Sequence, residues 1–179
     1  MLRRWAFVAV AYLSGCGGES APDAPPASAE AKAPAEIGYD TRRLRPRNEE
    51  TLAAMFERLR RTAVKDGKFA AVLFSADWCE PCRRLEIELG NMHPPSDIGH
   101  LRIFEIKEED WEAATRMNEV NALRTRWTPT INQYPVLVVL DEKGERIEEM
   151  QQATDRLEHE GVEPTLVNWF KALQPARSG

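Results

Sequence analysis

Several features of other protein classes are missing from this sequence of 179 residues. It contains no run of about 20 apolar residues, the length that a membrane-spanning helix needs. It has neither the glycine-rich loop of a phosphate site nor the nucleophile elbow of a serine hydrolase. Its formal net charge is −5, and no basic face carries interleaved aromatic residues. Nucleotide binding, serine hydrolysis and nucleic-acid partners are therefore not expected.

Cysteine is also scarce, and the first of the three, Cys16, ends a segment with the features of an export signal. Two arginines precede a short apolar run, residues 5–13, which predicts a lipoprotein signal peptide over residues 1–15. The tetrapeptide "LSGC" resembles the lipobox of bacterial lipoproteins. This resemblance implies lipid attachment at Cys16 and an exported, membrane-anchored protein that faces the periplasm. Gly17 favours the outer membrane in a Gram-negative cell. The alternative is an ordinary signal peptide followed by a chance cysteine.

Composition divides the rest of the chain into a tether and one domain. Residues 17–36 contain seven alanines, four prolines and no large apolar side chain, so residues 16–39 are predicted to be the lipidated cysteine and a flexible tether. Residues 40–175 are predicted to fold, and residues 176–179 to form a C-terminal tail.

The folded part alternates between helical and extended patterns. Helices are predicted over 48–67 with Asn48 as the cap, from the cysteine pair to about 91, over 108–123 and over 163–173. Strands are predicted over 68–76 and 100–107, and a hairpin over 135–150 with a turn at 142–144. This order predicts an α/β fold with a central mixed sheet and helices on both faces.

The other two cysteines, Cys79 and Cys82, stand where an apolar strand gives way to a helix. Backbone N–H groups at a helix N-terminus favour a thiolate, and two intervening residues place both sulfurs within bonding reach. In an oxidising, exported setting the pair can form an intramolecular disulfide. We expect Cys79 to be the exposed attacking thiol and Cys82, one turn further, to be the shielded resolving thiol.

The segment "FSADWCEPCRRLE" resembles the active-site segment of the thioredoxin superfamily. "ADWC" is similar to the C-terminal domain of DsbD, and "WCEPC" to the ResA/TlpA-type reductases. The resemblance implies a thioredoxin-like three-layer fold and thiol–disulfide exchange by Cys79 and Cys82, with Trp78 and Pro81 beside them and no organic cofactor. It also implies disulfide-bearing extracytoplasmic partners and an upstream thiol donor, such as a membrane conductor of reducing equivalents.

A second resemblance concerns proline. "QYPVLVVLDEKGERI" is similar to the superfamily segment that carries a cis-proline facing the cysteines, which implies that role for Tyr134 and Pro135. Pro129 is the weaker alternative, because polar residues after it interrupt the apolar strand. Residues 124–133 are predicted to form a loop beside the site, where Trp127 and Tyr134 would shape the choice of partner.

One position departs from the superfamily pattern. Many thioredoxins carry a buried acid six residues before the first cysteine, and here that residue is Leu73. Glu80 is the nearest substitute as a proton acceptor, and Asp77 is another. A carboxylate beside Cys79 opposes the helix dipole and disfavours the thiolate. We therefore expect a reductant of partner disulfides rather than an oxidant.

Two other kinds of protein remain as alternatives. The cysteine pair with His93 and His100 would make a zinc site, but the histidine spacing exceeds the usual range. A thioredoxin-like adaptor or Cu(I) chaperone would hold a ligand on the thiols without redox cycling, with Met92 and His93 nearby in the sequence. No metal ligand set is predicted.

Overall fold

The computed structural model describes residues 35–128 and 133–173. The predicted signal peptide, the lipidation site Cys16 and the alternative proline Pro129 lie outside the described residues. Within these residues, no helix is both long enough and apolar enough to cross a membrane.

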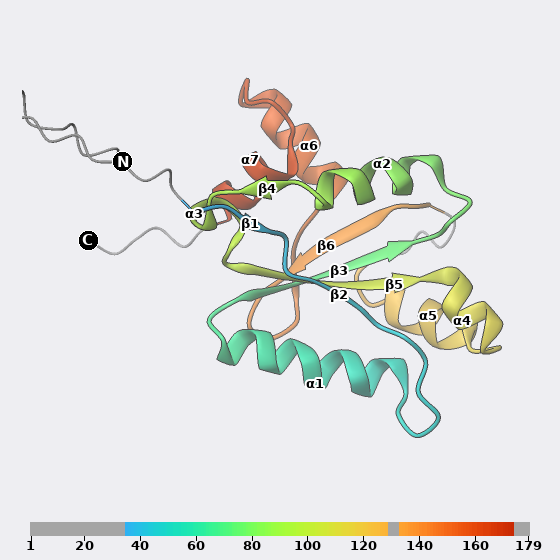
Figure 1. Ribbon diagram of the computed structural model, residues 1–179. Coiled ribbons are helices and arrows are strands. Elements are labelled where there is room, and N and C mark those ends of the chain that lie inside the picture. Colours follow the sequence, from blue (N-terminus) through green and yellow to red (C-terminus); the bar gives the residue numbers. More distant parts are fainter. Residues whose placement is uncertain (1–34, 129–132, 174–179) are drawn as a thin grey trace, which may run out of the picture. The chain divides into compact units, whose positions relative to one another are not determined.

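A five-stranded mixed sheet forms the centre of the domain (Figure 1). Its strands are β2 (Thr41–Arg43), β5 (Leu101–Lys107), β3 (Phe69–Ser75), β6 (Val136–Leu140) and β7 (Arg146–Glu149), in that spatial order. The first three are parallel to one another, whereas β6 runs antiparallel to β3 and β7 antiparallel to β6. The predicted α/β class with a mixed sheet is confirmed.

Helices cover both faces of this sheet (Figure 1). One face carries α1 (Leu52–Lys65), α4 (Glu108–Ala113) and α5 (Met117–Arg124). The other carries α2 (Glu80–Leu89), α3 (Pro95–Ile98), α6 (Met150–His159) and α7 (Leu166–Ala172). Strand β3 reads as an unbroken apolar run because its side chains alternate between two cores: Val72 packs on the α1 side and Leu73 on the α2 side.

Helix α1 begins later than its sequence suggests. The predicted cap, Asn48, is exposed, and the N-cap is Thr51, whose hydroxyl accepts a hydrogen bond from the Ala54 N–H at 3.3 Å. Thr51 takes this place because Leu52 is the first fully buried side chain of the helix. Phe56, one turn further, is also fully buried and packs edge-on against Phe104 of β5.

The prediction of a single helix over 108–123 is wrong, because the two helices α4 and α5 occupy that stretch. The chain turns at Thr115, whose φ of 56° is outside the helical range. This break lets the two short helices contribute separately to the core: Trp111 comes from α4, and Val120 and Leu123 come from α5.

Two further elements, β2 and α6 (Met150–His159), were not predicted, because their sequence patterns are weak. Strand β2 lies in a stretch that reads as basic and polar, since an edge strand of three residues shows almost no alternation. Helix α6 follows β7 directly and buries only Ala153 and Leu157.

Residues 37–39, at the end of the predicted tether, also belong to the folded structure. Strand β1 (Ile37–Gly38) pairs with β4 (Met92–His93), and Tyr39 packs edge-on against Phe170.

Candidate functional site

The two cysteines form a disulfide at the N-terminus of α2. Cys79 is the N-cap residue, and its Sγ accepts a hydrogen bond from the Cys82 N–H at 3.2 Å. Pro81 occupies the first turn, where its missing N–H costs no helical hydrogen bond. The Cα atoms of the two cysteines are 5.2 Å apart, within the usual range for a disulfide. The motif thus places a sulfur where free N–H groups can stabilise a thiolate.

Both cysteines are buried in this disulfide state. Cys79 is 4% exposed and Cys82 is 2% exposed, because Ala76 and Tyr134 pack against them. The expectation of an openly exposed Cys79 is therefore wrong. The two sulfurs still differ in their surroundings, since Cys79 lines the adjacent groove and Cys82 does not.

The peptide bond between Tyr134 and Pro135 is cis, as predicted. Pro135 directly precedes β6 and lines the same groove as Cys79. Strand β6 is paired with β3, and β3 leads into the cysteine segment, so the sheet itself brings Pro135 to the cysteines.

The groove beside the disulfide has a volume of about 940 Å³. Its walls come from three places in the chain: the cysteine segment with α2, residues 133–135, and the junction of β7 with α6. Trp78 is 64% exposed at its rim and stands edge-on to Tyr134, with ring centroids 5.6 Å apart. Trp78, Glu80, Pro81, Tyr134 and Pro135 all line the groove. The structure therefore brings together the predicted site residues that lie within its described part.

Trp127 does not belong to this site. Its side chain packs against Phe56 in the core on the α1 side, and its indole N–H donates to the Gly144 carbonyl at 3.0 Å. The prediction that Trp127 shapes partner choice is therefore wrong.

The carboxylates near the cysteines are engaged by cations. Glu80 forms an ion pair with Arg83, and its side chain is 60% exposed. Asp77 accepts a hydrogen bond from Lys107 Nζ at 2.6 Å, and this bond lowers the pKa of Asp77. The role of Glu80 as a proton acceptor stays a prediction.

A polar cluster lies where thioredoxins carry the buried acid. Leu73 is fully buried, but its register partner on β5 is Glu105, which accepts a hydrogen bond from the Ser75 hydroxyl at 3.0 Å. Two residues on, Lys107 also contacts Glu86 of α2 at 2.6 Å. Burial works against the charged lysine, but its hydrogen bonds to carboxylates outweigh this and raise the pKa of Lys107. Glu105 is half-buried and lies beside Leu73 on the neighbouring strand.

Arg124 is a site residue that the sequence reasoning missed. Its side chain is fully buried, its guanidinium lies 4.5 Å from the centroid of the Tyr134 ring, and it donates to the Gln133 carbonyl. Burial lowers the pKa of Arg124, whereas burial and a hydrogen bond to Glu108 raise the pKa of Tyr134. The signal was available: Arg124 is four residues after the buried Val120, so it lies on the apolar face of α5.

The histidines and the methionine of the alternative metal sites do not gather at the cysteine pair. His93 packs edge-on against Tyr39, and the His100 ring is within 3.0 Å of the Phe170 carbonyl. Met92 is 53% exposed on β4. Across residues 35–128 and 133–173, no group of three or more His, Cys, Asp or Glu side chains has a geometry that could hold a metal ion.

The strand order, the disulfide at the start of α2 and the cis-proline before β6 together make the arrangement that the sequence resemblance implies. The fold is thioredoxin-like. No protein-family model matches the chain of this thioredoxin-like protein, and no curated protein matches it significantly.

Three solved structures, among others, match this chain. A disulphide isomerase from Xylella fastidiosa Temecula1 is 17% identical, with 73% of this chain and 97% of that chain covered and a TM-score of 0.44. DsbH oxidoreductase is 17% identical, with coverage of 88% and 96% and a TM-score of 0.42. Poplar thioredoxin h is 18% identical, with coverage of 68% and 92% and a TM-score of 0.41. At these values the similarities assign no activity to this thioredoxin-like chain.

Proposed function

We propose that this protein is a lipid-anchored, extracytoplasmic thiol–disulfide oxidoreductase that reduces disulfides in partner proteins. The observation that carries the proposal is the position of the Cys79–Cys82 disulfide. Cys79 caps α2, and together with Pro135 it lines an open groove. A buried pair of structural cysteines would not need a groove or a cis-proline beside it.

The first step is attack on a partner disulfide by the reduced protein. The Cys79 thiolate bonds to one partner sulfur while the partner S–S bond breaks, and the second partner sulfur leaves as a thiolate that takes up a proton. Cys79 is the attacking residue because it lines the groove, and because the Cys82 N–H that now points at its Sγ would stabilise the thiolate.

The second step releases the partner. Cys82 attacks the Sγ of Cys79, the mixed disulfide breaks, and the internal disulfide seen in this structure forms. The partner has then gained two electrons and two protons, which the Cys79–Cys82 dithiol has lost. An upstream dithiol protein must restore the reduced pair, and we assign that role to a thiol donor such as a membrane conductor of reducing equivalents.

The groove supports a protein substrate in an extended conformation. Tyr134 and Pro135 line this groove, so an incoming chain would pass beside them to reach Cys79. Trp78 and Met150 add apolar surface on either side, while Glu149 and Gln151 add polar groups. A partner segment with a large apolar side chain next to its cysteine fits this composition best.

The proposal is tested with the two cysteine variants in an insulin-reduction assay. Cys79→Ser is expected to abolish turnover, and Cys82→Ser to stop after one step as a mixed disulfide that gel electrophoresis detects without reductant. The matched control is Cys16→Ser, which keeps the dithiol and should retain full turnover in solution. Wild-type activity in Cys79→Ser, or tight Cu(I) binding without turnover, would replace the proposal with a non-cycling adaptor or copper chaperone.

The direction of electron flow is read from the reduction potential of the pair. A value near the thioredoxin range of about −270 mV supports a reductase, whereas a value near about −120 mV makes the protein a disulfide donor.

The anchor is tested by labelling cells with a radioactive fatty acid. The label should appear on the wild-type protein and be absent from Cys16→Ser, and an equally labelled variant would refute lipidation at that residue.

A further inference from the structure

Lys107, the last residue of β5, is a buried cation that the proposed redox steps do not use. Its register partner is Ser75, the residue with which β3 ends. Its Nζ lies 2.6 Å from Oδ1 of Asp77 and 2.6 Å from Oε1 of Glu86. Burial opposes its charge, but the hydrogen bonds to these two carboxylates outweigh burial and raise the pKa of Lys107. The lysine therefore stays charged where the chain turns from β3 into α2.

The two carboxylates lie on opposite sides of the disulfide along the chain. Asp77 comes just before Cys79, and Glu86 lies on α2 after Cys82. One ammonium group of β5 thus bridges the two ends of the turn that carries the disulfide. Such a bridge restrains how far the two ends can move apart.

Two further contacts hold the backbone of Asp77. Its N–H donates to Oε1 of Glu109, on α4, at 2.7 Å, and its carbonyl accepts from Nη1 of Arg83, on α2, at 3.2 Å. The other oxygen of the Glu109 carboxylate is buried and has no hydrogen-bond partner among the residues that the structure describes. An exposed contact is weak by itself. Here, however, residues of β5, α4 and α2 bind the side chain, the N–H and the carbonyl of one residue, which directly precedes Trp78 and Cys79.

We infer that Lys107 and Glu109 are positioning residues of the redox site, which act through Asp77 to hold Cys79 against the N–H groups that stabilise its thiolate. The inference rests on the proposed function, in which Cys79 is the attacking thiol. The Cys82 N–H points at the Sγ of Cys79, so the segment before Cys79 and the start of α2 must keep their relative position. Asp77 is then an anchor. The hydrogen bond from Lys107 lowers the pKa of Asp77, which makes this carboxylate a poor proton acceptor.

The test measures how fast iodoacetamide alkylates Cys79 in the full chain carrying Cys16→Ser and Cys82→Ser, where Cys79 is the single thiol. At about pH 6 the rate follows the thiolate fraction. Lys107→Met and Asp77→Ala break the same contact but change the local charge in opposite directions, so charge alone would slow alkylation in the first and speed it in the second. A positioning role predicts that both slow it by about threefold and that the double variant is no slower than either single one.

Glu109 supplies an independent pair of variants. Glu109→Met removes the acceptor of the Asp77 N–H and should slow alkylation by about threefold, although it also removes a negative charge. Glu109→Gln keeps an acceptor oxygen and should restore the wild-type rate.

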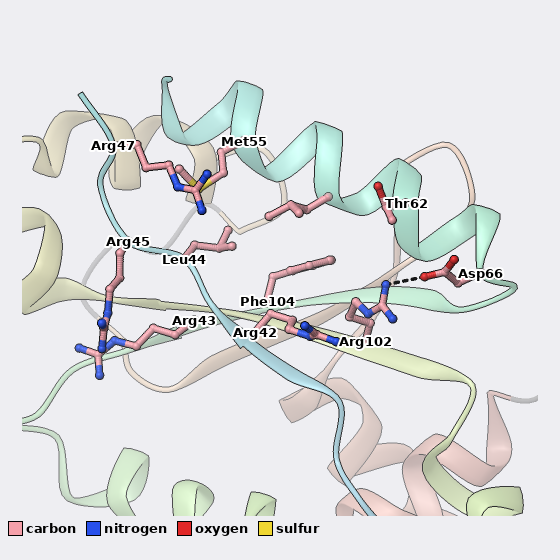
Figure 2. Close-up of a pocket in the computed structure, with 11 residues that line it drawn as sticks. Arg42, Arg43, Leu44, Arg45, Arg47, Met55, Thr62, Asp66, Arg102 and Phe104 are labelled. Atoms are coloured by element: carbon pink, nitrogen blue, oxygen red, sulfur yellow. Dashed lines mark hydrogen bonds and ion pairs between the residues drawn. The ribbon is translucent and has the colours of Figure 1, made fainter. Parts of the chain in front are cut away.

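Arg102→Met is the matched control for Lys107→Met. Arg102 lies near the other end of β5, its side chain is 14% exposed against 11% for Lys107, and it also pairs with two carboxylates, those of Asp40 and Asp66. Figure 2 shows the pair with Asp66. Thermal unfolding should detect a loss of stability in both variants, but alkylation of Cys79 should keep its wild-type rate in Arg102→Met. Asp77 is exposed, so Asp77→Ala provides a variant that folds even if Lys107→Met does not.

Faster alkylation in Asp77→Ala, an equal fall in Arg102→Met, or wild-type rates in both Lys107→Met and Glu109→Met would overturn the inference. In the chain that keeps Cys82, the same variants should lower kcat for insulin reduction by about threefold. A wild-type chain that reduces no insulin would refute the proposed function, whereas the alkylation rates would still decide whether Lys107 and Glu109 position Cys79.

Discussion

The buried side chain of Arg124 supports the segment that carries the cis-proline. Its guanidinium stacks on Tyr134 and holds the Gln133 carbonyl, and Tyr134 in turn packs against the disulfide and against Trp78. Burying an arginine is unfavourable unless its charge is compensated. Here the Tyr134 ring and the Gln133 carbonyl compensate part of that charge, although Nε and Nη1 of Arg124 have no hydrogen-bond partner within the described residues. We therefore expect the position of Tyr134 to depend on Arg124.

Replacing Arg124 tests this dependence. Arg124→Lys keeps the charge but loses the planar group that both stacks and donates, so the free energy of unfolding should fall by about 1–3 kcal/mol. The rate of insulin reduction should fall about tenfold through KM, because Tyr134 forms a wall of the substrate groove. Arg126→Lys is the matched control, since Arg126 is exposed and stacks on Trp127 away from the groove. Equal losses in the two variants, or an unchanged KM in Arg124→Lys, would contradict a positioning role.

At the scale of the elements, mutation can test which residue caps the start of helix α1. Thr51→Ala removes the hydroxyl that accepts the Ala54 N–H, and the free energy of unfolding should fall by about 1 kcal/mol. Asn48→Ala should change it by less than about 0.5 kcal/mol, because Asn48 is exposed and outside the helix. Urea unfolding measures both. A larger loss for Asn48→Ala would place the cap where the sequence alone suggested.

The turn between β6 and β7 gives a second test at this scale. Gly144 has a φ of 89°, and a Cβ there would lie 3.1 Å from Nε of the buried Arg60, whose Nη1 donates to the Glu142 carbonyl. Gly144→Ala should therefore lower the free energy of unfolding by roughly 2–3 kcal/mol, from both backbone strain and the contact with Arg60.

Gly67→Ala is the control for this variant, because its φ of 71° carries the same strain while a Cβ there meets nothing within 4 Å. Its loss should be about 1 kcal/mol. Equal losses at the two positions would show that the contact with Arg60 contributes nothing.

For the whole molecule, Asp40 links the edge strand to the rest of the sheet and makes stability depend on pH. Burial disfavours its charged form, but hydrogen bonds from Lys68, Arg102 and Arg42 outweigh that effect and hold the pKa of Asp40 well below its ordinary value of 3.8. A carboxyl with a lower pKa in the folded state adds stability above its unfolded-state pKa and loses it as the pH falls towards the folded-state value.

The free energy of unfolding should therefore decrease as the pH drops below about 4, and Asp40→Asn should flatten that part of the profile while lowering stability at pH 7. Glu158→Gln, at an exposed position on α6, is expected to leave the profile unchanged. Urea unfolding between pH 2 and pH 7 provides the measurement. A profile for Asp40→Asn as steep as that of the wild type would show that other carboxyls dominate.

The sequence alone determined the features that depend on neighbours along the chain. The apolar run of β3 followed by Cys79, Pro81 and Cys82 predicted a strand, a helix start and a paired disulfide, because the helix N-terminus itself brings the two sulfurs together. The cis bond before Pro135 also followed, through the resemblance of its segment.

Only the tertiary structure decided the features that depend on contacts between distant segments. Edge strand β2 exists because β5 offers it hydrogen-bond partners, and the break at Thr115 follows from the core positions of α4 and α5. The burial of Cys79 against Tyr134 and the contact of Arg124 with the Tyr134 ring likewise join residues that no local pattern connects. Their shared physical reason is that burial and charge compensation are set by whatever the fold places opposite a side chain.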